Sequence, residues 1–127
     1  MSWEFKIFKT SSDAASASLG SCKSVRSAID QHVEEVDWVL EPSLLEMMDK
    51  TADALRDEGW DESLIQNSMH ANCYGHAKID LLEFHFTELN REPLESFQIE
   101  VEGKGDPFEK VRKLCCSAGW NCMILLD

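Results

Sequence analysis

The sequence predicts an α+β domain with a four-stranded, mainly antiparallel sheet. Residues 81–87 and 96–102 each alternate between apolar and polar side chains, and a short polar turn joins them, which is typical of an antiparallel hairpin. Residues 3–9 alternate in the same way, and residues 121–126 form a strongly apolar run. Between these segments, apolar residues recur at helical spacing and predict helices that cover the sheet.

Capping signals define the two helices expected to pack on this sheet. Ser21 follows Gly20 and precedes apolar residues at helical spacing, so we expect a helix from Ser21 that closes at Asp37-Trp38, with Trp38 anchoring its end to the core. The segment Asp106-Pro107-Phe108-Glu109 has an N-cap, a proline at the first helical position and a glutamate that reaches back. It predicts a second helix, which Gly119 ends.

A helical insertion is predicted at about residues 42–76. Ser43 begins a capping box, and Gly59 ends the helix that follows it. Asp61 is the expected cap of the next helix, which Gly75 ends. These two segments predict a helical hairpin.

The resulting order is β-α-(αα)-β-β-α-β. It matches the ferredoxin-like arrangement with an inserted helical hairpin, and other antiparallel α+β layouts share the same order. Residues 10–19 are small and polar without periodicity, which predicts a loop. No linker divides the chain, so we expect a single domain over residues 1–127.

The charge is strongly negative and concentrated. The chain has a formal net charge of −12. Residues 34–62 hold eleven acids against Lys50 and Arg56, a sum of 2 − 11 = −9. Such a field repels phosphate backbones and anionic lipid, so we expect neither nucleic-acid nor membrane binding.

A cytoplasmic location is expected. The N-terminus lacks the order of a secretory signal, and no apolar run approaches the roughly 18 residues of a membrane helix. Five cysteines, an odd number with two adjacent, are not typical of a disulfide framework and favour a reducing compartment.

The acidic stretch predicts a surface that binds a basic protein, although solubility alone also accounts for it. Trp38 or Trp60 would be its aromatic anchor if exposed. Immunity proteins of bacterial toxin systems, which are small, often acidic and block basic toxin domains, fit this pattern. We therefore predict a binding protein rather than an enzyme. The residues assigned to the partner-binding surface are Glu34, Glu35, Asp37, Glu41, Glu46, Asp49, Asp53, Asp57, Glu58, Trp60, Asp61 and Glu62.

The alternative is a small-ligand or metal-binding protein, or an enzyme, that uses His70, Cys73, His76 and His85. Imidazole and thiolate are zinc ligands. On a helix, however, His70 and His76 lie about 120° from eclipsed at roughly 100° per residue. They converge with Cys73 only if the helix breaks at Gly75, and a fourth ligand such as His85 is needed. We therefore assign neither a metal nor a cofactor from the sequence.

The predicted central hairpin places four ionisable residues on its outward face. These side chains could do acid–base chemistry if the face lay in a cleft, whereas a solvated sheet face with charge is ordinary. A further alternative is that the inserted helices cover this face. The four residues are Glu83, His85, Glu100 and Glu102.

The oligomeric state is left open. Residues 122–126 are apolar on both faces of the predicted strand, so this strand is either central in the sheet or an exposed edge that can pair with another chain.

Seven short stretches of the chain form a pattern: Leu19-Gly20-Ser21, Asp37-Trp38, Leu82-Glu83-Phe84-His85-Phe86, Phe97-Gln98-Ile99-Glu100-Val101, Gly103-Lys104-Gly105-Asp106-Pro107, Leu114-Cys115 and Gly119-Trp120. In these stretches the chain resembles a family of small, functionally uncharacterised bacterial cytosolic proteins. The resemblance implies a compact cytosolic domain and no catalytic residues. The region from Pro42 to about Lys78 departs from the family pattern, where a shorter connection is expected.

Overall fold

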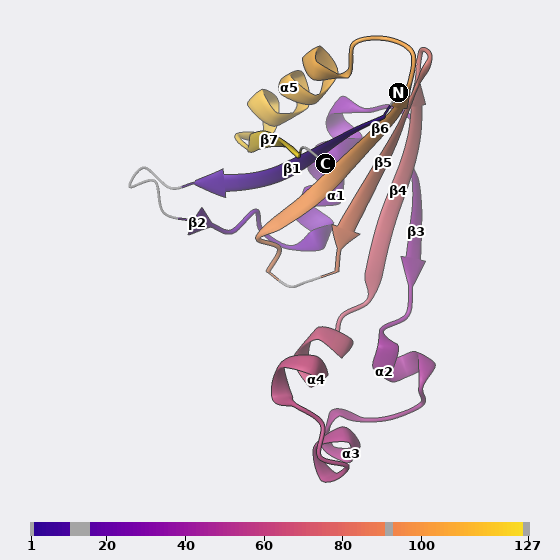
Figure 1. Ribbon diagram of the computed structural model, residues 1–127, viewed down its shortest axis with the longest axis vertical. Coiled ribbons are helices and arrows are strands. Elements are labelled where there is room, and N and C mark those ends of the chain that lie inside the picture. Colours follow the sequence, from indigo (N-terminus) through magenta and orange to yellow (C-terminus); the bar gives the residue numbers. More distant parts are fainter. Residues whose placement is uncertain (1, 11–15, 91–92, 126–127) are drawn as a thin grey trace.

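The computed structural model, shown in Figure 1, describes residues 2–10, 16–90 and 93–125. None of the described helices is long and apolar enough to cross a membrane. In chain order the elements are β1 (Ser2–Thr10), β2 (Ser16–Ala17), α1 (Cys22–His32), β3 (Asp37–Glu41), α2 (Leu44–Met47), α3 (Ala52–Asp57), α4 (Glu62–Ser68), β4 (Asn72–Ile79), β5 (Leu82–Leu89), β6 (Ser96–Gly103), α5 (Pro107–Ala118) and β7 (Asn121–Leu125).

The described strands form one antiparallel sheet in the order β7-β1-β6-β5-β4-β3. The two residues of β2 extend it by pairing with Lys9 and Thr10 at the end of β1. The sheet is strongly twisted, so that β1 crosses the direction of β4 at a steep angle (Figure 1). Among the described strands β7 pairs with β1 alone, so β7 is an edge strand and exposes Met123 and Ile124.

The predicted α+β class agrees with this structure, but the four-stranded sheet is wrong. The sheet has six main strands because β3 and β4 add to the edge formed by β5. The sequence pattern predicts a helix as far as residue 76, yet β4 has a period of two: Cys73, Gly75 and Ala77 are buried, and the residues between them are more exposed. Pairing on both sides satisfies the backbone of β4 and decides in favour of the strand.

The first helix is also shorter than predicted. Ser21 caps it as expected, since its Oγ accepts a hydrogen bond from the Ser24 backbone N–H at 3.1 Å. The helix ends at His32, however, and Asp37-Trp38 begins β3 instead of closing the helix. Trp38 still ties this segment to the core, because its ring centroid lies 5.8 Å from that of Phe86.

Trp38 lies directly over a glycine of the neighbouring strand. Gly75 is its cross-strand partner, and a Cβ at Gly75 would approach Cζ3 of Trp38 to 2.6 Å. The Trp38 indole N–H donates a hydrogen bond to Oδ1 of Asp30 at 2.8 Å. The glycine therefore makes room for the ring that joins β3 to both the sheet and α1.

The predicted hairpin of two helices is three short helices. Ser43 caps as expected, accepting from the Glu46 N–H at 3.3 Å, but the helix stops after one turn. Asp49 has a φ of 55°, a conformation that aspartate tolerates better than most residues. Thr51 then caps a second helix through the Ala54 N–H at 3.2 Å.

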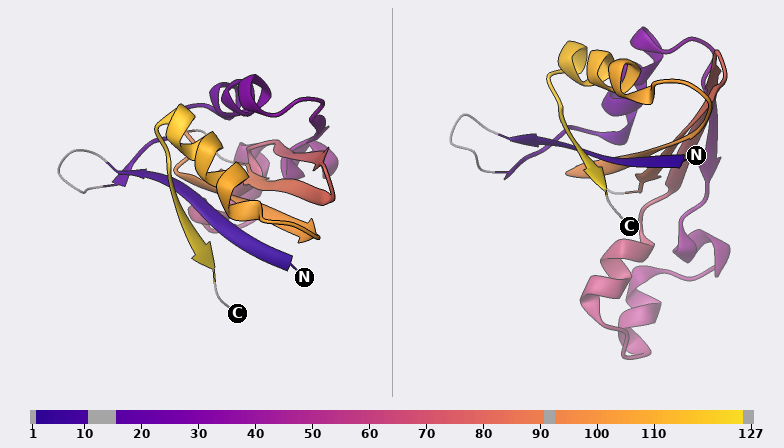
Figure 2. Two further views of the ribbon diagram at one scale, coloured as in Figure 1. Left: turned by 90° about the horizontal axis from the view of Figure 1, so that it is seen from above. Right: turned by 45° about the horizontal axis from the view of Figure 1, so that its top comes forward.

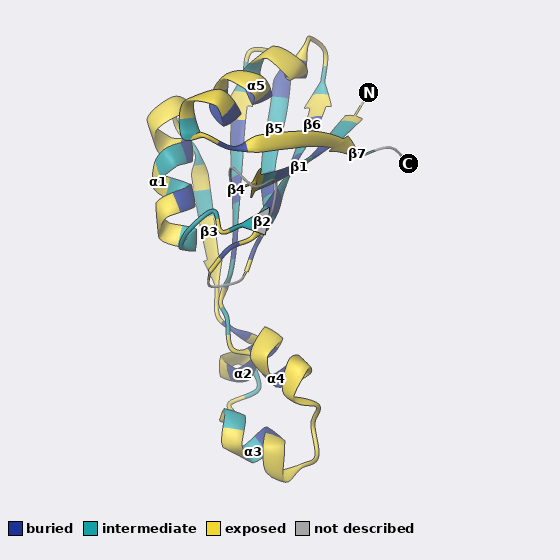
Figure 3. Ribbon diagram, turned by 90° about the vertical axis from the view of Figure 1, so that its left-hand side faces the viewer, coloured by how far each residue is buried: buried dark blue, intermediate teal, exposed yellow. Residues whose placement is uncertain are grey.

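Two helices, α1 and α5, cover one face of the sheet, as Figure 3 shows. The α5 caps are as predicted: Asp106 accepts from the Phe108 N–H at 2.9 Å, and Gly119 ends the helix with a φ of 76°. The core between these helices and the sheet includes Phe5, Ile7, Val25, Ile29, Phe84, Phe86, Phe97, Ile99, Val101, Val111, Leu114 and Trp120.

The segment 42–71, which we call the helical lobe, extends beyond the ends of β3 and β4 (Figure 1). In the tilted view of Figure 2 it again lies apart from α1 and α5. Leu45, Leu55 and Ile65 form its buried cluster, which is separate from the core under the sheet. The described lobe therefore has a small apolar core of its own.

Replacing Leu55 by alanine should unfold the lobe and leave the sheet intact. Leu55 is fully buried, and Leu→Ala at such sites costs about 2–5 kcal/mol. Hydrogen exchange should accelerate at the amides of 44–68, with β5 and β6 unchanged. Leu64→Ala, at a side chain that is 53% exposed, is the matched control and should have little effect. Equal loss of protection in β6 would show that lobe and sheet unfold as one unit.

Candidate functional site

All eleven carboxylates of the predicted partner-binding surface are exposed. Three of them form ion pairs: Glu58 with Lys50 at 2.6 Å, and both Asp53 and Glu62 with Arg56 at 2.9 Å. Within the part of the chain that the structure describes, the other eight have no ion-pair partner. Most of the negative charge is therefore open to solvent.

Arg56 makes the best-defined of these contacts. Its Nε and Nη2 donate to the two carboxylate oxygens of Glu62 at 3.0 and 2.9 Å. This bidentate pair lowers the pKa of Glu62 from its ordinary value to about 2. Both side chains are exposed, so the pair limits repulsion within the lobe without adding much stability.

The structure does not bring the eleven carboxylates into one patch. Glu34 and Glu35 precede β3, Asp37 and Glu41 lie on it, and the remaining seven belong to the lobe. Since β3 runs toward the lobe, its first residues lie at the far end of the strand (Figure 1). Lys50 and Arg56 oppose the seven lobe acids, so residues 42–71 have a net charge of 2 − 7 = −5.

The lobe and β3 also expose apolar side chains, which the sequence did not indicate. Of the eleven large apolar side chains that the described residues expose, seven fall within 39–69. Trp60, one of the two proposed anchors, is 36% exposed, whereas Trp38 is half-buried against the core. The exposed carboxylates and most of the exposed apolar side chains therefore belong to the same part of the chain. The seven are Val39, Leu40, Leu44, Met47, Trp60, Leu64 and Met69.

The sheet face away from α1 and α5, which we call the open face, carries the second candidate site. As predicted, Glu83, His85, Glu100 and Glu102 lie on this face, alternating with buried residues of β5 and β6. The lobe extends from the end of the sheet and leaves the open face uncovered (Figure 3). The alternative that the inserted helices cover this face is therefore wrong.

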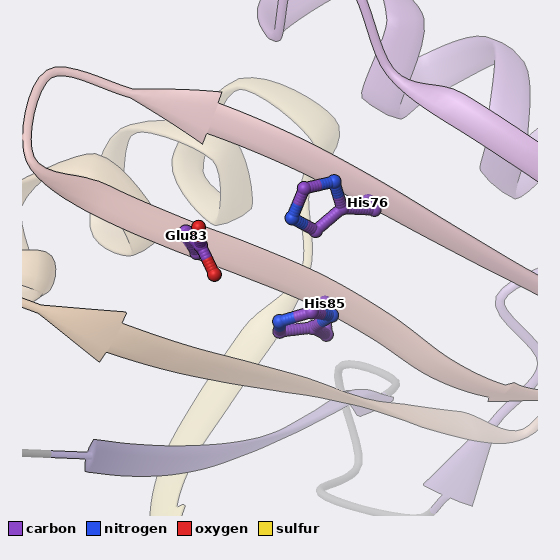
Figure 4. Close-up of side chains that lie close together, drawn as sticks. All are labelled: His76, Glu83 and His85. Carbon is purple, nitrogen blue, oxygen red and sulfur yellow. The ribbon is translucent and has the colours of Figure 1, made fainter.

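Two histidines meet on the open face. His76 of β4 and His85 of β5 are direct cross-strand partners, and their ring centroids lie 4.8 Å apart. Glu83 lies two residues before His85 on the same face. The ligand atoms of these three side chains all lie within 4.8 Å of one another (Figure 4).

The structure does not bring the alternative metal-ligand candidates His70, Cys73 and His76 together. Because these residues continue into β4 rather than a helix, Cys73 is buried on the core side and His76 lies on the opposite face. His70 precedes the strand and is absent from the cluster of potential metal ligands among the described residues. Burial raises the pKa of the Cys73 thiol, which makes it a poor ligand. Of the four predicted residues, only His76 and His85 come together.

A hollow of about 420 Å³ adjoins the two histidines. Asp37, Tyr74 and Thr87 are among the residues that line it. Tyr74 donates a hydrogen bond from its hydroxyl to Glu41 Oε1 at 2.7 Å, and this bond to a carboxylate raises the pKa of Tyr74.

Comparison with known proteins gives no relative. No family model matches the chain, and neither the curated proteins nor the solved structures contain a significant match. The resemblance to small bacterial proteins therefore stays a prediction.

Tyr74 allows the β3–β4 pairing to be tested by titration, because it is the one tyrosine of the chain. Its ultraviolet absorbance should titrate above the ordinary tyrosine pKa of about 10. Glu41→Gln removes the negative acceptor and should lower the Tyr74 pKa toward that value. Glu46→Gln, on α2, should leave the titration unchanged. A Tyr74 pKa that does not respond to Glu41→Gln would contradict the contact.

Proposed function

We propose that this protein binds a basic protein partner through the helical lobe. The observation that carries the proposal is the coincidence, on one small protruding segment, of unpaired carboxylates and exposed apolar side chains. Charge alone would account for solubility. Solubility does not require large exposed apolar side chains, whereas a protein-binding surface does. The lobe exposes five of them on the same segment as the carboxylates. The five are Leu44, Met47, Trp60, Leu64 and Met69.

The charge would act mainly on the rate of association. Glu46, Asp49, Asp57 and Asp61 are lobe carboxylates without an ion pair in the described structure. Their field extends over about one Debye length, roughly 8 Å at physiological salt, and would steer a cationic surface toward the lobe. The same field disfavours nucleic acid, whose backbone is also negative.

The apolar side chains would act mainly on the lifetime of the complex. Trp60 is partly exposed beside Asp61, and tryptophans at interface centres contribute strongly when buried by a partner. A partner that buries Trp60 and Leu64 therefore gains burial energy that charge pairs in water do not supply.

Immunity-type neutralisation is the form of binding that best fits these features. A toxin domain that binds nucleic acid carries a cationic surface, and an acidic, partly apolar lobe can cover such a surface. The partner class we propose is accordingly a basic protein domain whose cationic surface has an apolar centre.

The test compares three forms of the full chain as bait in lysate of the native cell at low salt. The lobe variant combines Glu46→Gln, Asp49→Asn and Asp57→Asn, which remove unpaired charges and nearly preserve shape. Asparagine suits position 49 because it accepts the positive φ found there. The control variant combines Glu95→Gln, Glu102→Gln and Glu109→Gln, exposed carboxylates outside the lobe, and changes the net charge equally.

We expect wild type and the control variant to retain the same basic protein and the lobe variant to lose it. With the purified partner, the association rate constant of the lobe variant should fall about tenfold or more at low salt, and the difference should shrink as salt rises. Equal retention by all three forms, or retention of acidic proteins only, would contradict the proposal.

A further inference from the structure

We propose that His76, Glu83 and His85 form a binding site for a divalent transition-metal ion of the zinc type on the open face of the sheet. The inference is independent of the lobe, because β4 and β5 position all three side chains. His76 and His85 are direct partners on adjacent strands. Glu83 lies two residues before His85, so its side chain is on the same face of the sheet.

The three side chains have no other polar partner in the described structure. None of them takes part in a hydrogen bond or ion pair there, although all three are half-buried. Lys78 is the cross-strand partner of Glu83 and nevertheless forms no ion pair with it. Three partly desolvated donors that turn toward one another and bind nothing within the chain are available for a ligand.

The types of donor select the metal. Two imidazole nitrogens and one carboxylate oxygen suit zinc and its first-row neighbours, whereas calcium and magnesium prefer oxygen throughout. Two nitrogens on one tetrahedral zinc lie about 3.4 Å apart, given zinc–nitrogen bonds of about 2.0–2.1 Å. The donors here lie within 4.8 Å, a gap that rotation of half-buried side chains can close.

Three of the four charged cross-strand neighbours of these donors favour a cation, and Lys78 beside Glu83 opposes it. The sheet register places Asp37 beside His76, Glu100 beside His85 and Glu102 beside Glu83. These carboxylates add negative potential on both sides of the three donors, and they can accept hydrogen bonds from the imidazole N–H groups that do not bind the metal.

The site leaves room for a further ligand. Three protein donors leave at least one position of a tetrahedral ion for water or a small molecule, as in zinc sites that act on substrates. Both histidines line the hollow of about 420 Å³, so that position would open to it. The chain would thus hold its ion in an accessible site.

The test titrates Zn²⁺ into the reduced, EDTA-treated full chain by calorimetry and follows the histidine ring signals by NMR. We expect about one ion per chain and changes at His76 and His85. His76→Gln, His85→Gln and Glu83→Gln should each weaken binding by at least about tenfold, since even outer-sphere partners are worth that much. The two other histidines, His32 and His70, provide matched controls.

His32→Gln and His70→Gln should bind Zn²⁺ as wild type does. The exposed thiols of Cys116 and Cys122 are a competing source of zinc binding, so Cys116→Ser and Cys122→Ser complete the set and should also bind normally. Loss of binding in a serine variant, or undisturbed His76 and His85 signals at saturating Zn²⁺, would overturn the proposal. The NMR readout on wild type decides the matter even where a glutamine variant does not fold.

Discussion

The register of β4 between β3 and β5 is the constraint on which the other features depend. It places Gly75 beneath Trp38 on the core side, and this contact holds β3 and the tip of α1 to the sheet. The same register places His76 against His85 on the open face. A slip of one residue would exchange the two faces, burying an imidazole and exposing the glycine.

The lobe depends on that register as well, because it connects the end of β3 to the start of β4. Its buried cluster of Leu45, Leu55 and Ile65 is small, and a cluster of this size contributes little stability compared with the core under the sheet. Clustered like charges further weaken a compact state. Arg56 and Lys50 offset part of that repulsion and leave the outer carboxylates unpaired. The unpaired carboxylates do not stabilise the lobe, and this is the reason to propose that they serve binding instead.

Much of the sheet was predictable because its signals are local. Alternation identified β5 and β6, and caps at Ser21 and Asp106 placed the starts of α1 and α5. The outward face of the central hairpin, with Glu83 and His85, follows directly from that alternation.

The edge of the sheet was not predictable in the same way. The apolar stripe through Leu64, Ile65 and Met69 can be continued to Cys73 at helical spacing, and the competing period of two in β4 is carried by small residues such as Gly75 and Ala77. Strands built from such small residues are fixed by their neighbours rather than by propensity. Since His76 belongs to β4, a sequence pattern that favours a helix over this segment gives no sign that His76 meets His85.

The most direct measurement is therefore NMR on the backbone of residues 61–79. The register of β4 predicts cross-strand NOEs between His76 and His85 and between Val39 and Tyr74, together with strand-type chemical shifts over 72–79. Sequential amide–amide NOEs that continue from α4 through residue 74, without contacts to β3 or β5, would contradict it.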